Sequence, residues 1–227
     1  RSTAVIIVTV LFIAGIFFYY ARLFVNGGKW ATYPTNSHLY SDGRLLRAGD
    51  ITDSKGVVLA STRDGERHFN ENYYTRVATA HAVGDLEGFV STGVHAAFLP
   101  ELTGYNVLNG TYNQSGKGND MQLTLDSDLC VTALRSLGSR AGAVGVCNYK
   151  TGEIICMVSS YSFDPEEKSS KDEQKEGVYV NRLLSGQYTP GSVFKLVTCL
   201  SALENFSDFK SRTYTCKQGV TIGGEWL

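Results

Sequence analysis

The first feature of the chain is an uncharged apolar run at residues 3–21. A helix rises about 1.5 Å per residue, so this run would cover about 28 Å, close to the thickness of a bilayer's hydrocarbon core. A cleaved signal peptide is the alternative, but it would have a shorter apolar region followed by small residues, whereas residues 19–24 are bulky and partly aromatic. The pattern predicts an uncleaved membrane-spanning helix with residues 17–20 at a membrane interface.

A different composition follows from residue 27 to about residue 118. This region is rich in Gly, Asn, Ser and Tyr and has no long helical period. It predicts a small module of short strands and loops, which we call the pedestal module. Within it, the turn-forming residues 53–56 separate two short apolar stretches and predict a hairpin.

A second module is predicted from Met121 onward. Apolar and polar residues alternate over residues 121–125, as in a strand, and Asp126 or Ser127 can then cap a helix. Two apolar runs around the polar residues 148–152 predict a second hairpin. The apolar positions expected on one face of the helix are Leu129, Ala133, Leu134 and Leu137.

Two further patterns complete this module. Residues 164–177 mix charges of both signs and contain almost no apolar residue, which predicts a solvated loop without chemistry. A helix is predicted to begin near Pro190. Its apolar surface would consist of Val193, Leu196, Val197, Leu200 and Leu203.

Charge and ligand-forming residues exclude several functions. The chain has 21 basic and 22 acidic residues, so it offers no electrostatic case for binding nucleic acid. No metal site and no cofactor are predicted, because the histidines and cysteines lack ligand spacing. The five cysteines are interpreted mainly as small core residues, and the histidines as surface or hydrogen-bonded residues. They are Cys130, Cys147, Cys156, Cys199, Cys216, His38, His68, His81 and His95.

The candidate chemistry lies in Ser192-Val193-Phe194-Lys195, which places a hydroxyl and an amine three residues apart at a helix start. A lysine in an apolar cleft can act as a neutral base for a serine nucleophile, and the helix N-terminus favours developing negative charge. A simple helix cap is the alternative role for Ser192. The same spacing occurs between Ser207 and Lys210, but in a polar stretch that predicts a surface position for Ser207.

The context of Ser192 resembles a known family. Residues 181–195, NRLLSGQYTPGSVFK, are similar to the segment around the active-site serine of penicillin-binding transpeptidases. Residues 47–60, RAGDITDSKGVVLA, resemble the signature at the start of the pedestal in the monofunctional class, class B. Residues 121–130 resemble the first strand and helix of the transpeptidase domain, and residues 141–166 its hairpin and following turn. The resemblance covers nearly the whole chain, and the short pedestal resembles that of Gram-positive members.

The resemblance implies an α+β fold in three parts. Residues 1–25 would be the membrane anchor, residues 26–118 the pedestal, and residues 119–227 the beginning of a serine transpeptidase domain. The family has two later motifs, Ser-x-Asn and Lys-Thr-Gly, and neither follows Ser192 here. Lys150-Thr151-Gly152 precedes the serine and lies in the predicted hairpin turn. The chain is therefore expected to be an N-terminal fragment with little or no acylation activity by itself.

The resemblance further implies the function of the intact protein. It would be a peptidoglycan D,D-transpeptidase that cross-links stem peptides through an acyl-enzyme on Ser192, with Lys195 as its base and β-lactams as inhibitors. It would lie mainly outside the cytoplasm on a single-pass anchor and work with a polymerase of the shape, elongation, division and sporulation family. The alternatives are a catalytically inactive membrane-anchored assembly protein and, third, a β-lactam sensor.

Overall fold

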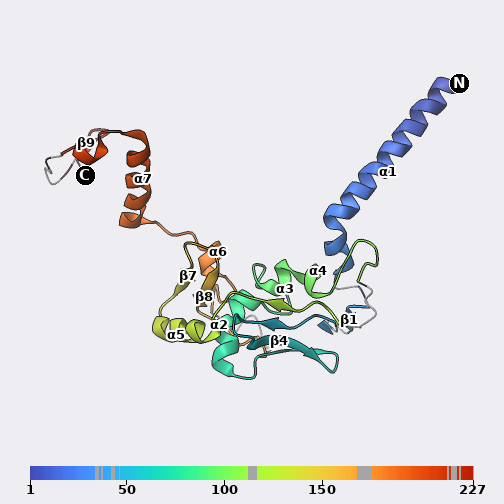
Figure 1. The fold of residues 1–227 in the computed structure, drawn as a ribbon, viewed down its shortest axis with the longest axis horizontal. Coiled ribbons are helices and arrows are strands. Elements are labelled where there is room, and N and C mark those ends of the chain that lie inside the picture. The colour runs from blue at the N-terminus through green and yellow to red at the C-terminus, as the bar shows by residue number, and fades with distance from the viewer. Residues whose placement is uncertain are drawn as a thin grey trace. The chain divides into compact units, whose positions relative to one another are not determined.

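The computed structural model describes residues 1–33, 36, 38–41, 44–45, 47–111, 117–167, 175–213, 215, 219 and 221–226. These residues form two compact units, Arg1–Gly186 and Gln187–Leu227. Figure 1 shows the elements of the first unit from blue to orange and those of the second in red. The two units are described separately below.

The predicted N-terminal helix is present as α1, Ser2–Ala31, a helix of 30 residues that runs well beyond the apolar run. Its length and composition are sufficient to cross a membrane, and its spanning window is not buried in the protein. At its C-terminal end α1 contacts the short helix α4, Leu99–Leu102. Gly28 lies there against Pro100, so closely that an added Cβ would be 3.0 Å from the Pro100 Cβ.

The pedestal residues form a four-stranded sheet in the order β5-β4-β3-β6. The predicted hairpin is confirmed, because β3, Ile51–Thr52, pairs antiparallel with β4, Val58–Arg63, and β4 pairs with β5, Glu66–Phe69. A separate small ladder joins β1, Tyr40–Ser41, to β2, Arg44–Leu45. The sheet encloses an apolar cluster that includes the fully buried Leu39, Ile51, Leu59 and Leu102.

The strand expected over residues 121–125 is shorter than predicted. β6 comprises Met121–Gln122 and pairs in parallel with β3, so a strand beyond the expected pedestal boundary belongs to the pedestal sheet. The Met121 N–H donates to the Asp50 carbonyl at 2.7 Å, and the Leu123 N–H to the Thr52 carbonyl at 2.8 Å. The residues on both sides of residue 118 accordingly belong to one compact unit. The domain boundary at 118/119 stays a prediction.

The pedestal region also contains a helix that the sequence patterns did not predict. α2, Tyr73–Val83, is capped by Asn72, whose side-chain oxygen accepts the N–H of Tyr74 at 2.9 Å. Its last seven residues are all buried. Val83 belongs to the apolar cluster of the pedestal sheet. Ala78 and Ala82 belong to a second buried cluster, which contains Cys130 and Cys156, and Ala80 belongs to a third, which contains Phe163 and Val178. A helix buried on several sides has no polar stripe, so its sequence shows no amphipathic period.

The second predicted helix and hairpin are both present (Figure 1). Helix α5, Ser127–Leu137, packs on β7, Gly142–Cys147, and β8, Ile154–Ser160, which pair antiparallel. The predicted face of α5 is confirmed at Ala133, Leu134 and Leu137, which belong to or pack against the buried cluster. It was wrong at Leu129, which is 36% exposed, because the adjacent Cys130 faces the core instead. When apolar residues lie all around a helix, the spacing of the residues alone does not determine which of them face the core.

The interpretation of the cysteines as core residues holds for two of them. Cys130 and Cys156 are fully buried in the cluster between α5 and β8, whereas Cys147 and Cys199 are exposed. Burial raises the pKa of Cys130 to about 12, so its thiol remains protonated. Cys216 lies outside the described residues.

His81 and His95 are buried and hydrogen-bonded, and a hydrogen-bonded role was one of the two expected for the histidines. The Arg67 side chain, itself 5% exposed, donates from Nε to His95 Nε2 at 3.0 Å. Burial, together with the adjacent Arg67 charge, lowers the pKa of His95 to about 3. His95 is therefore a neutral acceptor inside the pedestal.

The prediction of a solvated loop at residues 164–177 was wrong at its beginning. The Asp164 side chain is 3% exposed and binds Arg76 of α2 through two contacts, Nε to Oδ1 at 2.7 Å and Nη2 to Oδ2 at 2.6 Å. Glu166 accepts the Phe69 N–H at 2.7 Å. A partner distant in sequence thus explains why Asp164 is buried here. Residues 168–174 lie outside the described residues.

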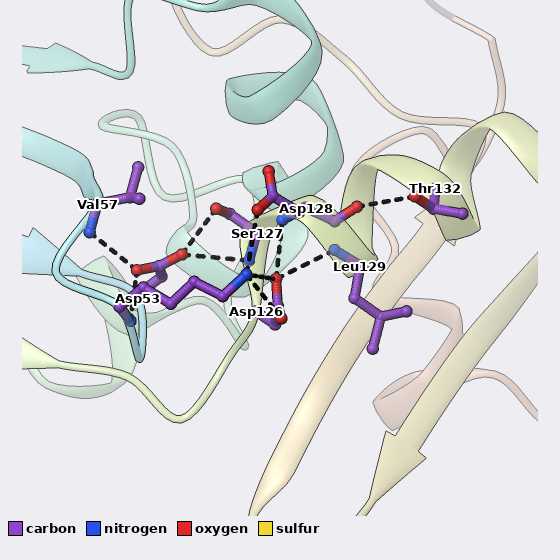
Figure 2. Close-up of polar contacts among 8 residues, drawn as sticks. Asp53, Val57, Asp126, Ser127, Asp128, Leu129 and Thr132 are labelled. Carbon is purple, nitrogen blue, oxygen red and sulfur yellow. Dashed lines mark hydrogen bonds and ion pairs between the residues drawn. The ribbon is translucent and has the colours of Figure 1, made fainter.

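A buried carboxylate joins the pedestal hairpin to the second module. Asp53 has 0% exposure and accepts the N–H groups of Lys55 and Val57, both at 2.8 Å, which closes the turn between β3 and β4. Its other oxygen accepts the Ser127 hydroxyl at 2.7 Å and the Ser127 N–H at 3.3 Å, at the first turn of α5. Figure 2 shows the carboxylate between Val57 on one side and Ser127 on the other.

Charged side chains, among them Asp126 and Asp128, lie beside this buried contact (Figure 2). Asp126 caps α5 by accepting the N–H groups of Asp128 at 3.1 Å and Leu129 at 3.2 Å. Lys55 Nζ lies 3.0 Å from Asp126 and 3.1 Å from Asp128. The Lys55 side chain thereby adds a second, solvent-exposed link between the turn and the helix.

The charge state of Asp53 follows from two opposing effects. Burial alone would raise the pKa of Asp53, but the hydrogen bonds from Ser127, Val57 and Lys55 outweigh it and hold the pKa below its ordinary value. A lowered folded-state pKa means that the stabilisation is complete above the ordinary carboxyl pKa. It is lost as the pH falls through the folded-state pKa.

Replacing Asp53 by Ala is expected to lower the free energy of unfolding by about 3 kcal/mol, because Ser127 and the turn N–H groups lose a buried charged acceptor. Urea denaturation at neutral pH measures this loss, and the difference from wild type should narrow in acid as Asp53 is protonated. Asp128→Ala is the matched control, because it removes a carboxylate that is 85% exposed and should cost less than about 1 kcal/mol. Equal losses in the two variants would contradict this account of Asp53.

Candidate active site

The two sequence-predicted site residues lie together at the start of one helix in the second unit. A 3-10 turn at Gly191–Phe194 contains Ser192 and continues directly into α7, Lys195–Asn205, which begins with Lys195. Pro190 precedes the turn and its carbonyl accepts the Val193 N–H at 3.3 Å. Because residues i and i+3 eclipse one another in a 3-10 turn, the Ser192 and Lys195 side chains project from the same side.

The backbone immediately before Ser192 is unusual. Gly191 has φ +55°, a left-handed conformation that a residue with a Cβ adopts only with strain. The left-handed residue and Pro190 together turn the chain sharply into the helix. The Pro-Gly entry, which distinguished Ser192 from Ser207 in the sequence, therefore has a direct structural role.

The environment of these two residues is open in this unit. Ser192 and Lys195 are both exposed, so the described residues of this unit do not by themselves supply the apolar cleft expected to make Lys195 a neutral base. The predicted apolar surface of α7 is also exposed. It comprises Val193 (71%), Leu196 (74%), Val197 (55%), Leu200 (58%) and Leu203 (47%). Water exclusion at the pair requires additional protein packed over this face.

The competing motifs lie in different surroundings. Ser207 follows α7, and Lys210 lies in the short 3-10 turn η3, Phe209–Ser211, so no long helix begins at this serine. Lys150-Thr151-Gly152 lies in the turn between β7 and β8, as predicted. There the Thr151 hydroxyl donates to Glu153 at 2.8 Å, and Gly152 has φ +80°. Among the described residues, the second unit contains the strands β9, Thr221–Ile222, and β10, Glu225–Trp226, which pair antiparallel.

The segment before Ser192 contains two polar residues to which the sequence patterns gave no role. Asn181 is 1% exposed and caps the short helix α6, Arg182–Ser185, at the end of the first unit. Arg182 donates from its backbone N–H to the Ser159 hydroxyl at 2.9 Å and from Nε to the Ser160 carbonyl at 2.7 Å. The signal for Asn181 in the sequence was its placement before a short apolar turn, which is a capping pattern. The contacts of Arg182 with the end of β8 have no such local signal.

The region around this site is similar to known proteins. The family of the penicillin binding protein transpeptidase domain matches residues 142–226, a range that contains Ser192 and Lys195. The chain is 36% identical over 97 residues to a peptidoglycan D,D-transpeptidase MrdA of Acinetobacter baumannii, covering 38% of this chain and 14% of the relative. It is 31% identical over 175 residues to stage V sporulation protein D of Bacillus subtilis, and the match covers 67% of this chain and 26% of the relative.

Solved structures agree with these sequence matches. A D,D-transpeptidase domain of a peptidoglycan glycosyltransferase from Eggerthella lenta aligns with TM-score 0.60 at 25% identity, over 79% of this chain and 42% of that one. Penicillin-binding protein 2 (PBP2) of Pseudomonas aeruginosa, in complex with WCK 5153, aligns with TM-score 0.56 at 27% identity. This alignment covers 75% of this chain and 41% of the PBP2 chain. The fold is thus the predicted α+β, transpeptidase-like one.

These matches support the class that the sequence indicated, a class B penicillin-binding protein. The chain spans about a quarter or less of the two curated relatives named above. It spans about two fifths of each of the two solved chains.

Proposed function

We propose that the protein to which this chain belongs is a peptidoglycan D,D-transpeptidase in which Ser192 is the nucleophile and Lys195 the base. The observation that carries the proposal is the Ser192 and Lys195 pair at the Pro-Gly entry of α7, inside the region that matches the transpeptidase family. Several relatives carry the name peptidoglycan D,D-transpeptidase, among them proteins of Acinetobacter baumannii and Mycolicibacterium smegmatis.

The proposed reaction begins with acylation. Neutral Lys195 accepts the Ser192 hydroxyl proton while Oγ attacks the carbonyl carbon of the penultimate D-Ala of a stem peptide. The Ser192 N–H supplies one donor for the resulting oxyanion, and a donor of this kind contributes about 3–4 kcal/mol. The C–N bond then breaks, the terminal D-Ala amine takes the proton, and the peptide remains as an ester on Ser192.

Deacylation completes the cross-link. An amine of a neighbouring stem peptide attacks the ester carbonyl and loses a proton, and a new amide bond forms. The proton returns to Ser192 Oγ as the ester bond breaks. A β-lactam would be opened by the same attack on its ring carbonyl, leaving a penicilloyl ester on Ser192 that blocks the site.

Exposure of the full-length protein to penicillin is expected to give one covalent adduct on Ser192, measured by intact-mass analysis and peptide mapping. Ser192→Ala should abolish the adduct, and Lys195→Ala should slow its formation by at least about 100-fold because the base is lost. Ser207→Ala is the matched control, since Ser207 has the same spacing to Lys210 but begins no long helix, and it should label normally. An adduct that still forms in the Ser192→Ala variant would contradict the assignment of Ser192 as the nucleophile.

We further propose that α1 anchors the protein as a single pass, with the rest of the chain outside the cytoplasm. Support comes from the length and apolar composition of α1 and from the exposure of its spanning window. Such a segment is stable in hydrocarbon because a helix satisfies its own backbone hydrogen bonds.

The exposed thiol of Cys147 offers a direct test of this orientation. A membrane-impermeant maleimide is expected to label Cys147 in intact cells, in a variant whose Cys199 and Cys216 are replaced by Ser. The additional substitution Cys147→Ser is the control and should remove the signal, because Cys130 and Cys156 are fully buried. Labelling only after cell lysis would place the second module in the cytoplasm and overturn the proposal.

The partner proposed for the intact protein is a peptidoglycan polymerase of the shape, elongation, division and sporulation family. Its support is the family resemblance together with the exposed apolar side chains along α1, which a second membrane protein can cover.

A photo-crosslinking amino acid at Phe12, Phe17 or Phe24 of α1 should form a crosslink to the co-expressed polymerase, detected by immunoblotting. The matched position is Tyr149, which is 87% exposed in the turn between β7 and β8 and should give no crosslink. Equal crosslinking at Tyr149 and at α1, or none at α1, would contradict a contact through the membrane helix.

A further inference from the structure

The last residues of the first unit are held by a buried polar network. The Asn181 side chain has 1% exposure, and its oxygen accepts the N–H groups of Leu183 at 3.2 Å and Leu184 at 3.3 Å. Its amide nitrogen donates to the His81 carbonyl of α2 at 3.4 Å and to the Met157 sulfur of β8 at 3.1 Å. One side chain thus links α6 to two other elements.

The neighbouring residue makes an independent attachment to the end of β8. The Arg182 backbone and Nε hold Ser159 and Ser160, which are 1% and 2% exposed. Leu183 packs against Gly145 of β7, where an added Cβ would lie 2.8 Å from the Leu183 methyl groups. The segment around α6 is therefore fixed against both strands of the hairpin, through polar and apolar contacts.

The chain immediately upstream is also fixed. His81 Nε2 lies 2.7 Å from the Val178 carbonyl, and the His81 ring packs against Phe163 with ring centroids 5.5 Å apart. Val178 and Phe163 belong to one buried cluster. The path from Val178 through α6 to Gly186 is consequently determined by contacts with α2 and β8.

A short tether connects this fixed path to the candidate nucleophile. Ser192 follows Gly186 by six residues, which span about 20 Å at most, because an extended chain advances about 3.3–3.6 Å per residue. The exit at Gly186 therefore limits the positions that Ser192 can take. Loss of the attachment would widen this range, and a misplacement of about 1 Å at a reacting atom can slow a reaction about 100-fold.

We propose that Asn181 and Arg182 are positioning residues that set the place of Ser192 for acylation by anchoring the chain at its exit from the first unit. The inference rests on the proposed transpeptidase function. It assigns neither residue a contact with the reacting atoms. Their effect passes through α6 and the tether to the 3-10 turn that contains Ser192.

The test compares acylation by benzylpenicillin in the full-length wild-type protein and in Arg182→Gln, Asn181→Ala and Asn181→Ser. The maximal acylation rate, the final labelled fraction and the melting temperature are measured for each variant. Arg182→Gln and Asn181→Ala are expected to lower the maximal rate at least 10-fold while the folded protein is still labelled completely. Asn181→Ser retains a capping oxygen and should recover part of the rate. Arg140→Gln, at an exposed arginine after α5, is the control and should match wild type.

The outcomes separate the possible failures. If Asn181 and Arg182 had only a structural role, their variants would have a lower melting temperature and a smaller folded fraction, but the folded molecules would be acylated at the wild-type rate. That result would overturn the positioning role of the two residues and leave the proposed function intact. Absence of Ser192 labelling in the wild-type protein would overturn the proposed function and the inference with it. Hydrogen exchange at residues 181–186 gives a second readout, because exchange should accelerate in the slow variants, and unchanged protection would contradict anchoring.

Discussion

The buried carboxylate of Asp53 is the contact on which the first unit depends. It receives two N–H donors from its own turn and two donors from Ser127 at the start of α5. An ionised carboxylate with 0% exposure is stable only when such donors are present. The turn of the pedestal hairpin and the first turn of α5 therefore have to form together, and the two modules share one folded unit.

The other elements of this unit extend from that junction. Helix α2 contacts β4 on one side and α5 and β8 on others, and its small side chains contribute to three apolar clusters. Arg76 of α2 then binds Asp164 in a largely buried ion pair, which holds the chain after β8. Because removal of either partner would leave a buried charge unpaired, Arg76 and Asp164 have to remain in contact.

The second unit has a different physical character. The candidate nucleophile lies in the 3-10 turn before α7 and the candidate base at the first residue of α7, and the helix has an exposed apolar face along its length. Such a face is stabilised only when other side chains cover it, and the same cover would exclude water from Lys195. The chemistry proposed for Ser192 thus depends on packing that the described residues of this unit do not provide.

The sequence by itself determined the elements whose signals are local. The apolar run, the turn after Asp53, the cap of α5, the 142–160 hairpin and the Pro-Gly entry to Ser192 all follow from the preferences of neighbouring residues. The resemblance of residues 181–195 likewise singled out Ser192 and Lys195 as the site, and the structure places both at one helix start.

Only the tertiary structure decided the features that depend on distant partners. The sequence did not predict α2 because burial on several sides removes the amphipathic period. On α5, packing against β8 decided that Cys130 and not Leu129 is buried. Asp164 was assigned to solvent because its partner, Arg76, lies 88 residues away. The roles of Asn181 and Arg182 depend in the same way on α2 and on the end of β8. Burial of a polar group is favourable only with its partner in place, and a local pattern contains no information about that partner.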